Sequence, residues 1–212
     1  MKRILLSLLV VFWAVILYAQ PQNSSQRITI YSKFKPAVIT LINGQVITVP
    51  QANIFLKESR LIYRNINQQI MEAKLSNIKT VDFDDRHYER IDTMLAWRVD
   101  TVGKNALYCV TKIDMVSLHN NIINSRDMTN IDLSNELLNI TTLDIDRDNM
   151  EYPLVNMFFY RYNGKIIPVH EREITRRITK KKLYDYKVVT SLATFSWTDI
   201  KSLLSLLKTI SK

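Results

Sequence analysis

A dense group of ionisable side chains occupies residues 82–90, Asp-Phe-Asp-Asp-Arg-His-Tyr-Glu-Arg. One interpretation is a metal-dependent or acid–base enzyme site, because carboxylates and an imidazole can together hold a divalent cation. The ligands would be Asp82, Asp84, Asp85 and His87. No second histidine or glutamate follows at a metal-ligand spacing. The sequence therefore favours the alternative, a charged loop in which Arg86 and Arg90 offset the acids.

A second acidic segment, Asp144 to Asp148, resembles the beginning of a calcium loop. The pattern then fails, because Asn149 replaces the glycine and Val155 replaces the final glutamate. A solvated acidic turn is the better interpretation. With three glycines in the whole chain, a glycine-rich phosphate loop is nearly excluded, and no Gly-x-Ser-x-Gly or His-Glu-x-x-His motif is present. We therefore predict no cofactor, and a non-enzymatic role is favoured.

Basic residues are concentrated near the C-terminus. Residues 161–187 hold nine bases and three acids, whereas residues 80–151 hold seven bases and 14 acids. The candidate binding residues are Arg172, Arg176, Arg177, Lys180, Lys181 and Lys182. A solvated helix face is the simpler interpretation, and an anionic lipid, an acidic glycan or an acidic protein surface is the functional one. Nucleic acid is not expected, since the chain carries an export signal.

That export signal is the N-terminal segment, residues 1–19. Lys2 and Arg3 precede an apolar run from Ile4 to Tyr18, and a polar stretch follows Ala19, which is the layout of a secretory signal peptide. We predict cleavage after Ala19 and a location in the periplasm or at the outer membrane. An uncleaved anchor is the alternative. The single cysteine, Cys109, excludes a disulfide within the chain and is expected to be a buried strand residue.

The elements that must position these groups are mostly short strands. Between residues 27 and 115, alternating apolar residues are separated by turn signals such as Asn43-Gly44. One strand is expected from Ile91 to Val99, and Pro50 is expected to end a strand or to mark an edge. A second hairpin is expected at Leu154 to Val169, around Asn163-Gly164. The fold class is therefore α+β and β-dominated, an antiparallel meander closed into a small barrel or a sandwich.

Three helices are expected. Asp114 is the predicted N-cap of a helix from Met115 to Asn124, and Glu171 to Ile178 reads as a basic helix. Ser196 and Asp199 resemble a capping box before an amphipathic terminal helix, which we expect to pack on the sheet. The expected organisation is a signal peptide (1–19), a β-rich module (27–115), a helix with an irregular, mostly extended connection (116–150), and a hairpin with helices (151–212). The last part either forms one domain with residues 27–115 or packs as a separate half.

Two regions resemble small exported proteins of Bacteroidetes. The signal segment ends Tyr-Ala-Gln, with Gln20 as the expected new N-terminus, and the segment Tyr162-Asn163-Gly164-Lys165-Ile166 precedes a basic helix and a Leu-rich helix. Asp92-Thr93-Met94 and Asp100-Thr101-Val102 match the Asp-Ser/Thr-apolar pattern at which that phylum attaches O-linked glycans. The resemblance implies periplasmic or outer-membrane localisation and possible glycosylation at Thr93 and Thr101. It implies no activity and no catalytic residue.

Together these features predict an exported cell-envelope protein with a binding or assembly role. Its partner would be an envelope protein, a glycan or an anionic lipid. The alternatives are a metal-dependent enzyme at residues 82–87 and a protein that binds an anionic membrane surface through residues 172–182.

Overall fold

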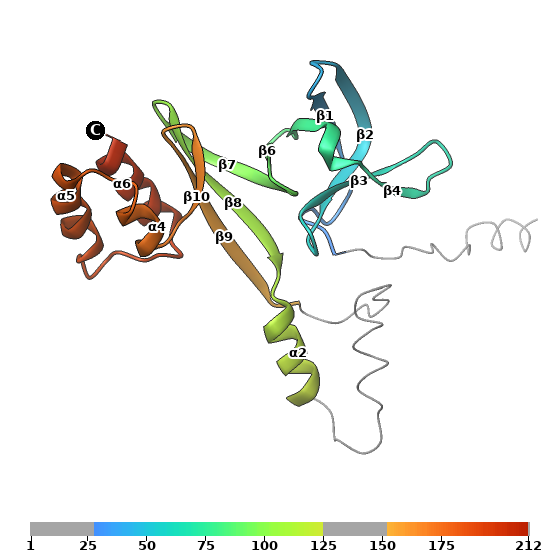
Figure 1. Ribbon diagram of the computed structural model, residues 1–212. Coiled ribbons are helices and arrows are strands. Elements are labelled where there is room, and N and C mark those ends of the chain that lie inside the picture. Colours follow the sequence, from blue (N-terminus) through green and yellow to red (C-terminus); the bar gives the residue numbers. More distant parts are fainter. Residues whose placement is uncertain (1–27, 125–151, 212) are drawn as a thin grey trace, which may run out of the picture. The chain divides into compact units, whose positions relative to one another are not determined.

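The computed structural model describes residues 28–124 and 152–211, and its centre is one antiparallel sheet (Figure 1). The sheet has ten strands in the order β10-β9-β8-β7-β6-β5-β1-β2-β3-β4. The strands are β1 (Lys35–Leu41), β2 (Val46–Phe55), β3 (Arg60–Arg64), β4 (Ile70–Glu72), β5 (Ile78–Asp82), β6 (His87–Ile91), β7 (Met94–Val102), β8 (Asn105–Ile113), β9 (Leu154–Tyr162) and β10 (Lys165–Pro168). A β-dominated α+β meander is confirmed. The signal segment and residues 125–151, which include the calcium-like loop, lie outside the described residues.

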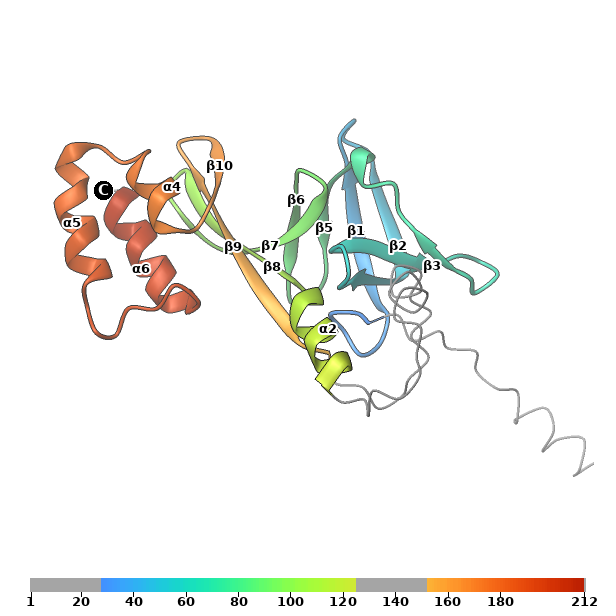
Figure 2. The same cartoon turned by 60° about the horizontal axis from the view of Figure 1, so that its bottom comes forward.

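Strands β1, β2, β3, β5, β6 and β7 curl around a shared apolar core (Figure 2). The curl brings the start of β3 to β7, where the Leu95 amide donates to the Ser59 carbonyl at 2.8 Å and the Ser59 hydroxyl donates to the Leu95 carbonyl at 2.6 Å. Ser59 adopts a left-handed conformation at this contact, with φ of 52°. The sheet remains open, so it is neither of the two closed forms expected from the sequence. Its curl is closer to a barrel than to a sandwich.

Three expectations about the strands were wrong. Residues 91–99 do not form one strand, because Ile91 ends β6 and Asp92, with φ of 53°, turns the chain into β7. The segment His87–Ile91, which we expected to be a charged loop, is a strand paired with β5 and β7. Pro50 does not end its strand, since β2 continues through a bulge opposite Lys35 and Ala37. A bulge accommodates proline because the ladder is already interrupted there.

The C-terminal hairpin belongs to the same sheet as the N-terminal strands. β9 pairs with β8 from Arg161 opposite Ala106 to Leu154 opposite Ile113. Its turn, Asn163-Gly164, has positive φ at both residues, as the sequence predicts for a two-residue hairpin loop. Residues 152–211 therefore extend the ladder that residues 28–113 begin.

Helix α2 (Met115–Asn124) confirms the predicted helix and its N-cap. One carboxylate oxygen of Asp114 accepts hydrogen bonds from the amides of Val116 and Ser117, each at 3.1 Å. The predicted basic helix, residues 171–178, is shorter in the structure, where α4 spans Glu171–Thr175. A short division separates it from α5 (Lys180–Thr190), a helix that the sequence did not predict. The division falls at Thr179, whose extended backbone and carbonyl, accepting from Lys182 and Leu183, begin the second helix.

The terminal helix α6 (Ile200–Ser211) packs on the sheet as expected. Its N-cap is Asp199 rather than Ser196, because the Asp199 carboxylate accepts from the Ser202 amide at 2.8 Å, which is the third helical position. The Ser196 hydroxyl instead accepts from the amide of Thr198 in the preceding turn. The helix buries its apolar face against β8, β9 and β10, using Leu203, Leu206, Leu207 and Ile210.

Candidate functional site

The acidic cluster of residues 82–87 is divided between two places. Asp82 and His87 face one another across β5 and β6, and Asp82 Oδ1 contacts His87 Nδ1. Asp84 and Asp85 lie in the turn between these strands and bind elsewhere: Asp84 Oδ1 is 3.0 Å from the Lys35 ammonium. In the described part of the chain, no three His, Cys, Asp or Glu side chains are arranged to hold a metal ion. The four residues therefore do not share one ligand set.

The turn at Asp85 is held by a phenol and by cations. The Tyr31 hydroxyl donates to Asp85 Oδ1 at 2.8 Å, and the Lys35 ammonium lies 3.4 Å from the same oxygen. Burial opposes the charge on Asp85, but the Tyr31 hydrogen bond and neighbouring donors outweigh it and lower the pKa of that carboxyl. Burial, followed by the Asp85 contact, raises the pKa of the Tyr31 phenol. Arg86 also lies 3.7 Å from Asp85, as the charge-offset interpretation expects, whereas the Arg90 guanidinium donates to the Ser76 carbonyl at 2.8 Å.

Glu89 is the centre of a larger polar network that the sequence did not reveal. Its Oε1 lies 2.8 Å from Arg98 Nη1, and its Oε2 contacts Arg161 Nη2 and accepts from the Tyr108 hydroxyl at 3.1 Å. These partners come from β7, β9 and β8. Burial raises the pKa of Glu89, but the Arg161 bond and charge, then Tyr108 and Arg98, outweigh it, so that the pKa is lowered. The network ties four neighbouring strands together.

His87 connects Asp82 to this network without completing it. Its Nε2 lies 3.4 Å from Glu89 Oε1, and this buried nitrogen has no hydrogen-bond partner among the described residues. Each oxygen of Glu89 already faces an arginine. The arrangement is that of an electrostatic clamp between strands, since Glu89 pairs with an arginine of β7 and with an arginine of β9.

Of the remaining residues that the sequence singled out, one is buried and two are exposed. Cys109 is buried in β8, as expected, and burial raises the pKa of its thiol. Thr93 in the β6–β7 turn and Thr101 near the end of β7 are both exposed. Their exposure leaves room for an attached glycan, and the modification itself stays a prediction.

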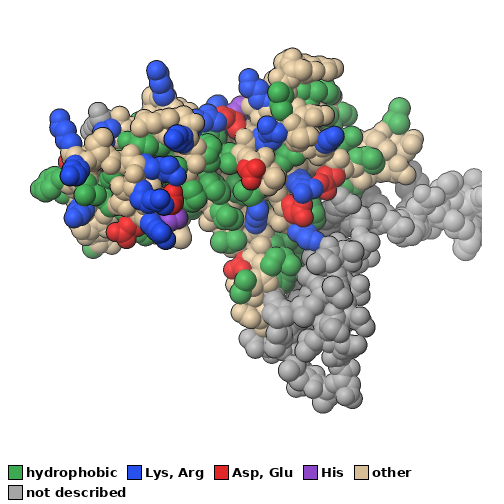
Figure 3. Space-filling view, in the orientation of Figure 1, with side chains coloured by type: hydrophobic (Ala, Val, Ile, Leu, Met, Phe, Trp, Pro, Cys, Tyr) green, Lys and Arg blue, Asp and Glu red, His purple; other side chains and the backbone are tan. Residues whose placement is uncertain are grey.

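The basic segment places its six cations in three kinds of environment. Arg176 and Arg177 share Glu173, at 3.3 and 3.0 Å. The Lys182 ammonium donates to the Ile210 carbonyl at 2.6 Å and so caps the C-terminal end of α6. Three exposed cations, Arg172, Lys180 and Lys181, form no ion pair with another described residue. Lys and Arg side chains gather over the helices at the left of Figure 3, among exposed hydrophobic side chains.

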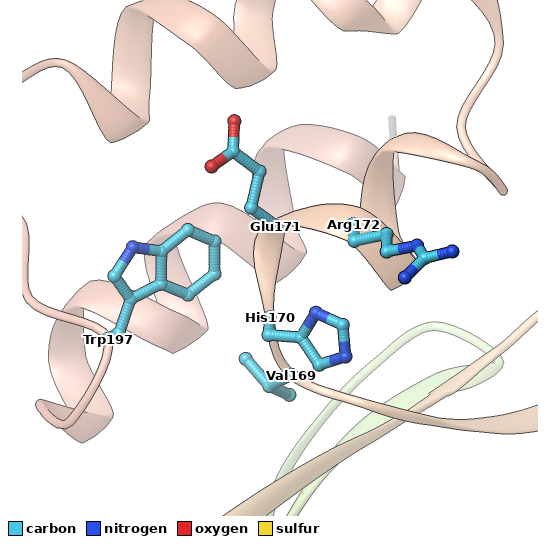
Figure 4. A pocket seen from close by; sticks show the side chains of 5 residues that line it. All are labelled: Val169, His170, Glu171, Arg172 and Trp197. Atoms are coloured by element: carbon cyan, nitrogen blue, oxygen red, sulfur yellow. The ribbon is translucent and has the colours of Figure 1, made fainter.

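A shallow hollow of about 590 Å³ lies beside this segment, between the start of α4 and the turn before α6. Val169, His170, Glu171, Arg172 and Trp197 line it. In Figure 4 the Trp197 indole and the Arg172 guanidinium lie on opposite sides of His170 and Glu171. The lining carries one acid, one guanidinium, an imidazole and an indole, so it has no strong charge of its own. Arg172 connects the hollow to the basic segment.

Scans against protein-family models, curated protein sequences and solved structures each found no match to this chain. None of the helices within residues 28–124 and 152–211 is long and apolar enough to cross a bilayer.

Proposed function

We propose that the protein is an exported cell-envelope protein with a binding role, and that residues 172–182 bind anionic groups of the envelope. The observation that carries the proposal is the uncompensated charge of Arg172, Lys180 and Lys181, three exposed cations with no ion pair among the described residues. Lone exposed cations gain most from an external anion, because they have no internal partner to lose. The predicted signal peptide restricts the available anions to those of the envelope.

The rest of the segment supports binding rather than catalysis. Glu173 holds Arg176 and Arg177 in place, and Lys182 fixes α5 to the end of α6. The exposed cations thus lie on α4 and α5, and the inner side of each of these helices packs into the core. The metal-enzyme alternative has no such support, since Asp82 and His87 are separated in their contacts from Asp84 and Asp85.

Reversal of the three free cations tests the proposal. The triple variant Arg172→Glu, Lys180→Glu, Lys181→Glu should bind soluble polyphosphate at least about 100-fold more weakly at low salt, because each basic residue near an anionic surface contributes about 1 kcal/mol. The measurement is a titration followed by fluorescence anisotropy of labelled polyphosphate, repeated at rising salt.

A matched control separates the segment from net charge. Lys33, Lys79 and Lys104 are exposed on other elements, and their reversal to glutamate changes the net charge by the same amount. This control should lose far less affinity than the segment variant. Equal losses in the two variants, or no binding by the wild type, would reject the proposal.

A further inference from the structure

Helix α5 exposes an apolar stripe. Tyr184, Val188 and Leu192 recur every fourth residue, and their exposed fractions are 74%, 46% and 54%. A spacing of four residues places Tyr184 and Val188 on one side of α5, which ends at Thr190. Leu192 lies in the turn that follows the helix, where its amide donates to the Val189 carbonyl. The opposite side already packs into the core through Leu183, Tyr186 and Val189. The stripe is therefore additional to what folding uses.

Three exposed lysines border the stripe. Lys180 and Lys181 lie one turn before Tyr184, and Lys187 lies one residue before Val188. Each is without an ion pair to another described residue, and Asp185 is the one acid on α5. At a membrane interface, exposed apolar side chains can enter the acyl boundary while the lysines beside them reach the headgroups.

We infer that the outer face of α5 and the turn after it dock on an anionic lipid bilayer, with Tyr184, Val188 and Leu192 entering the interface and Lys180, Lys181 and Lys187 contacting acidic headgroups. This inference rests on the proposed function and names its partner. It adds an apolar contribution to the binding free energy, and a soluble polyanion gains nothing from it because it has no acyl region.

Charge complementarity favours a bilayer over a second copy of the chain. Two α5 faces brought together would oppose lysine to lysine, with Asp185 as the one acid that each α5 contributes. Like charges placed opposite one another oppose association. An anionic bilayer satisfies the lysines and the stripe at the same time.

The test compares vesicles with soluble polyphosphate as ligands of the full chain. The variant Tyr184→Ser, Val188→Ser, Leu192→Ser should bind vesicles of phosphatidylglycerol and phosphatidylcholine at least about tenfold more weakly, since it removes three apolar insertions. Its polyphosphate affinity should equal that of the wild type, because the lysines remain. Vesicle flotation measures the first quantity and fluorescence anisotropy the second. All variants share one N-terminal segment, so any contribution from it is common to them.

The control variant Ile42→Ser, Ile66→Ser, Val116→Ser removes three exposed apolar side chains from other elements and should bind vesicles as the wild type does. Tyr184→Trp serves as a second, minimal change at the most exposed position, and it should bind vesicles at least as tightly as the wild type. Stripe and control variants that bind vesicles equally, or a Tyr184→Trp variant that binds them more weakly, would overturn the inference. A wild type that binds polyphosphate but no vesicle would overturn this inference alone, whereas one that binds neither would reject the proposed function.

Discussion

Replacement of Glu89 by glutamine should lower the free energy of unfolding by about 2–3 kcal/mol at neutral pH. The Glu89 side chain is 13% exposed and faces the guanidinium groups of Arg98 and Arg161. The neutral amide leaves these two cations close together without a counter-charge. Removal of one partner from a buried ion pair costs about 3–5 kcal/mol, and the value is smaller here because both arginines remain about one-third exposed. Urea unfolding followed by circular dichroism measures the change.

The same variant should alter how stability depends on pH. Because the folded-state pKa of Glu89 lies below the ordinary value of 4.5, its contribution is complete above that value and is lost as pH falls through the folded-state pKa. The wild type should therefore lose more stability in acid than Glu89→Gln does. Glu58→Gln is the control, since the Glu58 carboxylate pairs with Arg60 at an exposed site and should cost less than about 0.5 kcal/mol. Parallel pH profiles for wild type and Glu89→Gln would contradict the clamp.

Leu207→Ala should lower the free energy of unfolding by about 3 kcal/mol. Leu207 is fully buried where α6 packs on β8, β9 and β10, so that truncation removes apolar contacts and leaves a cavity. Ser205→Ala on the exposed side of the same helix should change stability by less than about 0.5 kcal/mol. Thermal and urea unfolding of both variants would show the difference. Equal stability would mean that α6 is not part of the core.

The sequence correctly predicted a turn and a helix start that are specified by the residues at those positions. Asn163-Gly164 specifies its turn because both residues tolerate positive φ, and Asp114 specifies the start of α2 because its carboxylate reaches two free amides. β6 was missed because its polar residues read as a loop. His87 and Glu89 have partners on other strands, and Arg161 lies 72 residues from Glu89 in the chain. Short-range patterns carry no information on such pairings.

In the candidate binding region, too, the sequence predicted one part and missed another. The excess of basic residues at 172–182 is visible in composition alone. The structure adds that three of these cations, Arg176, Arg177 and Lys182, bind other groups of the chain, whereas the other three form no ion pair with a described residue. The exposed apolar residues Tyr184, Val188 and Leu192 were missed because the expected basic helix ended at Ile178 and no helix was expected over residues 180–190. Only the packing of Leu183 and Tyr186 into the core shows which side of the helix faces outward.

The most direct test of an envelope-binding protein is the fractionation of the cells that produce it, with the intact mass of the recovered chain. We expect a chain that begins at Gln20, is recovered with the envelope, and is partly released by high salt, because cations carry part of the binding. Recovery of the chain in the cytosol with residues 1–19 still attached would contradict it.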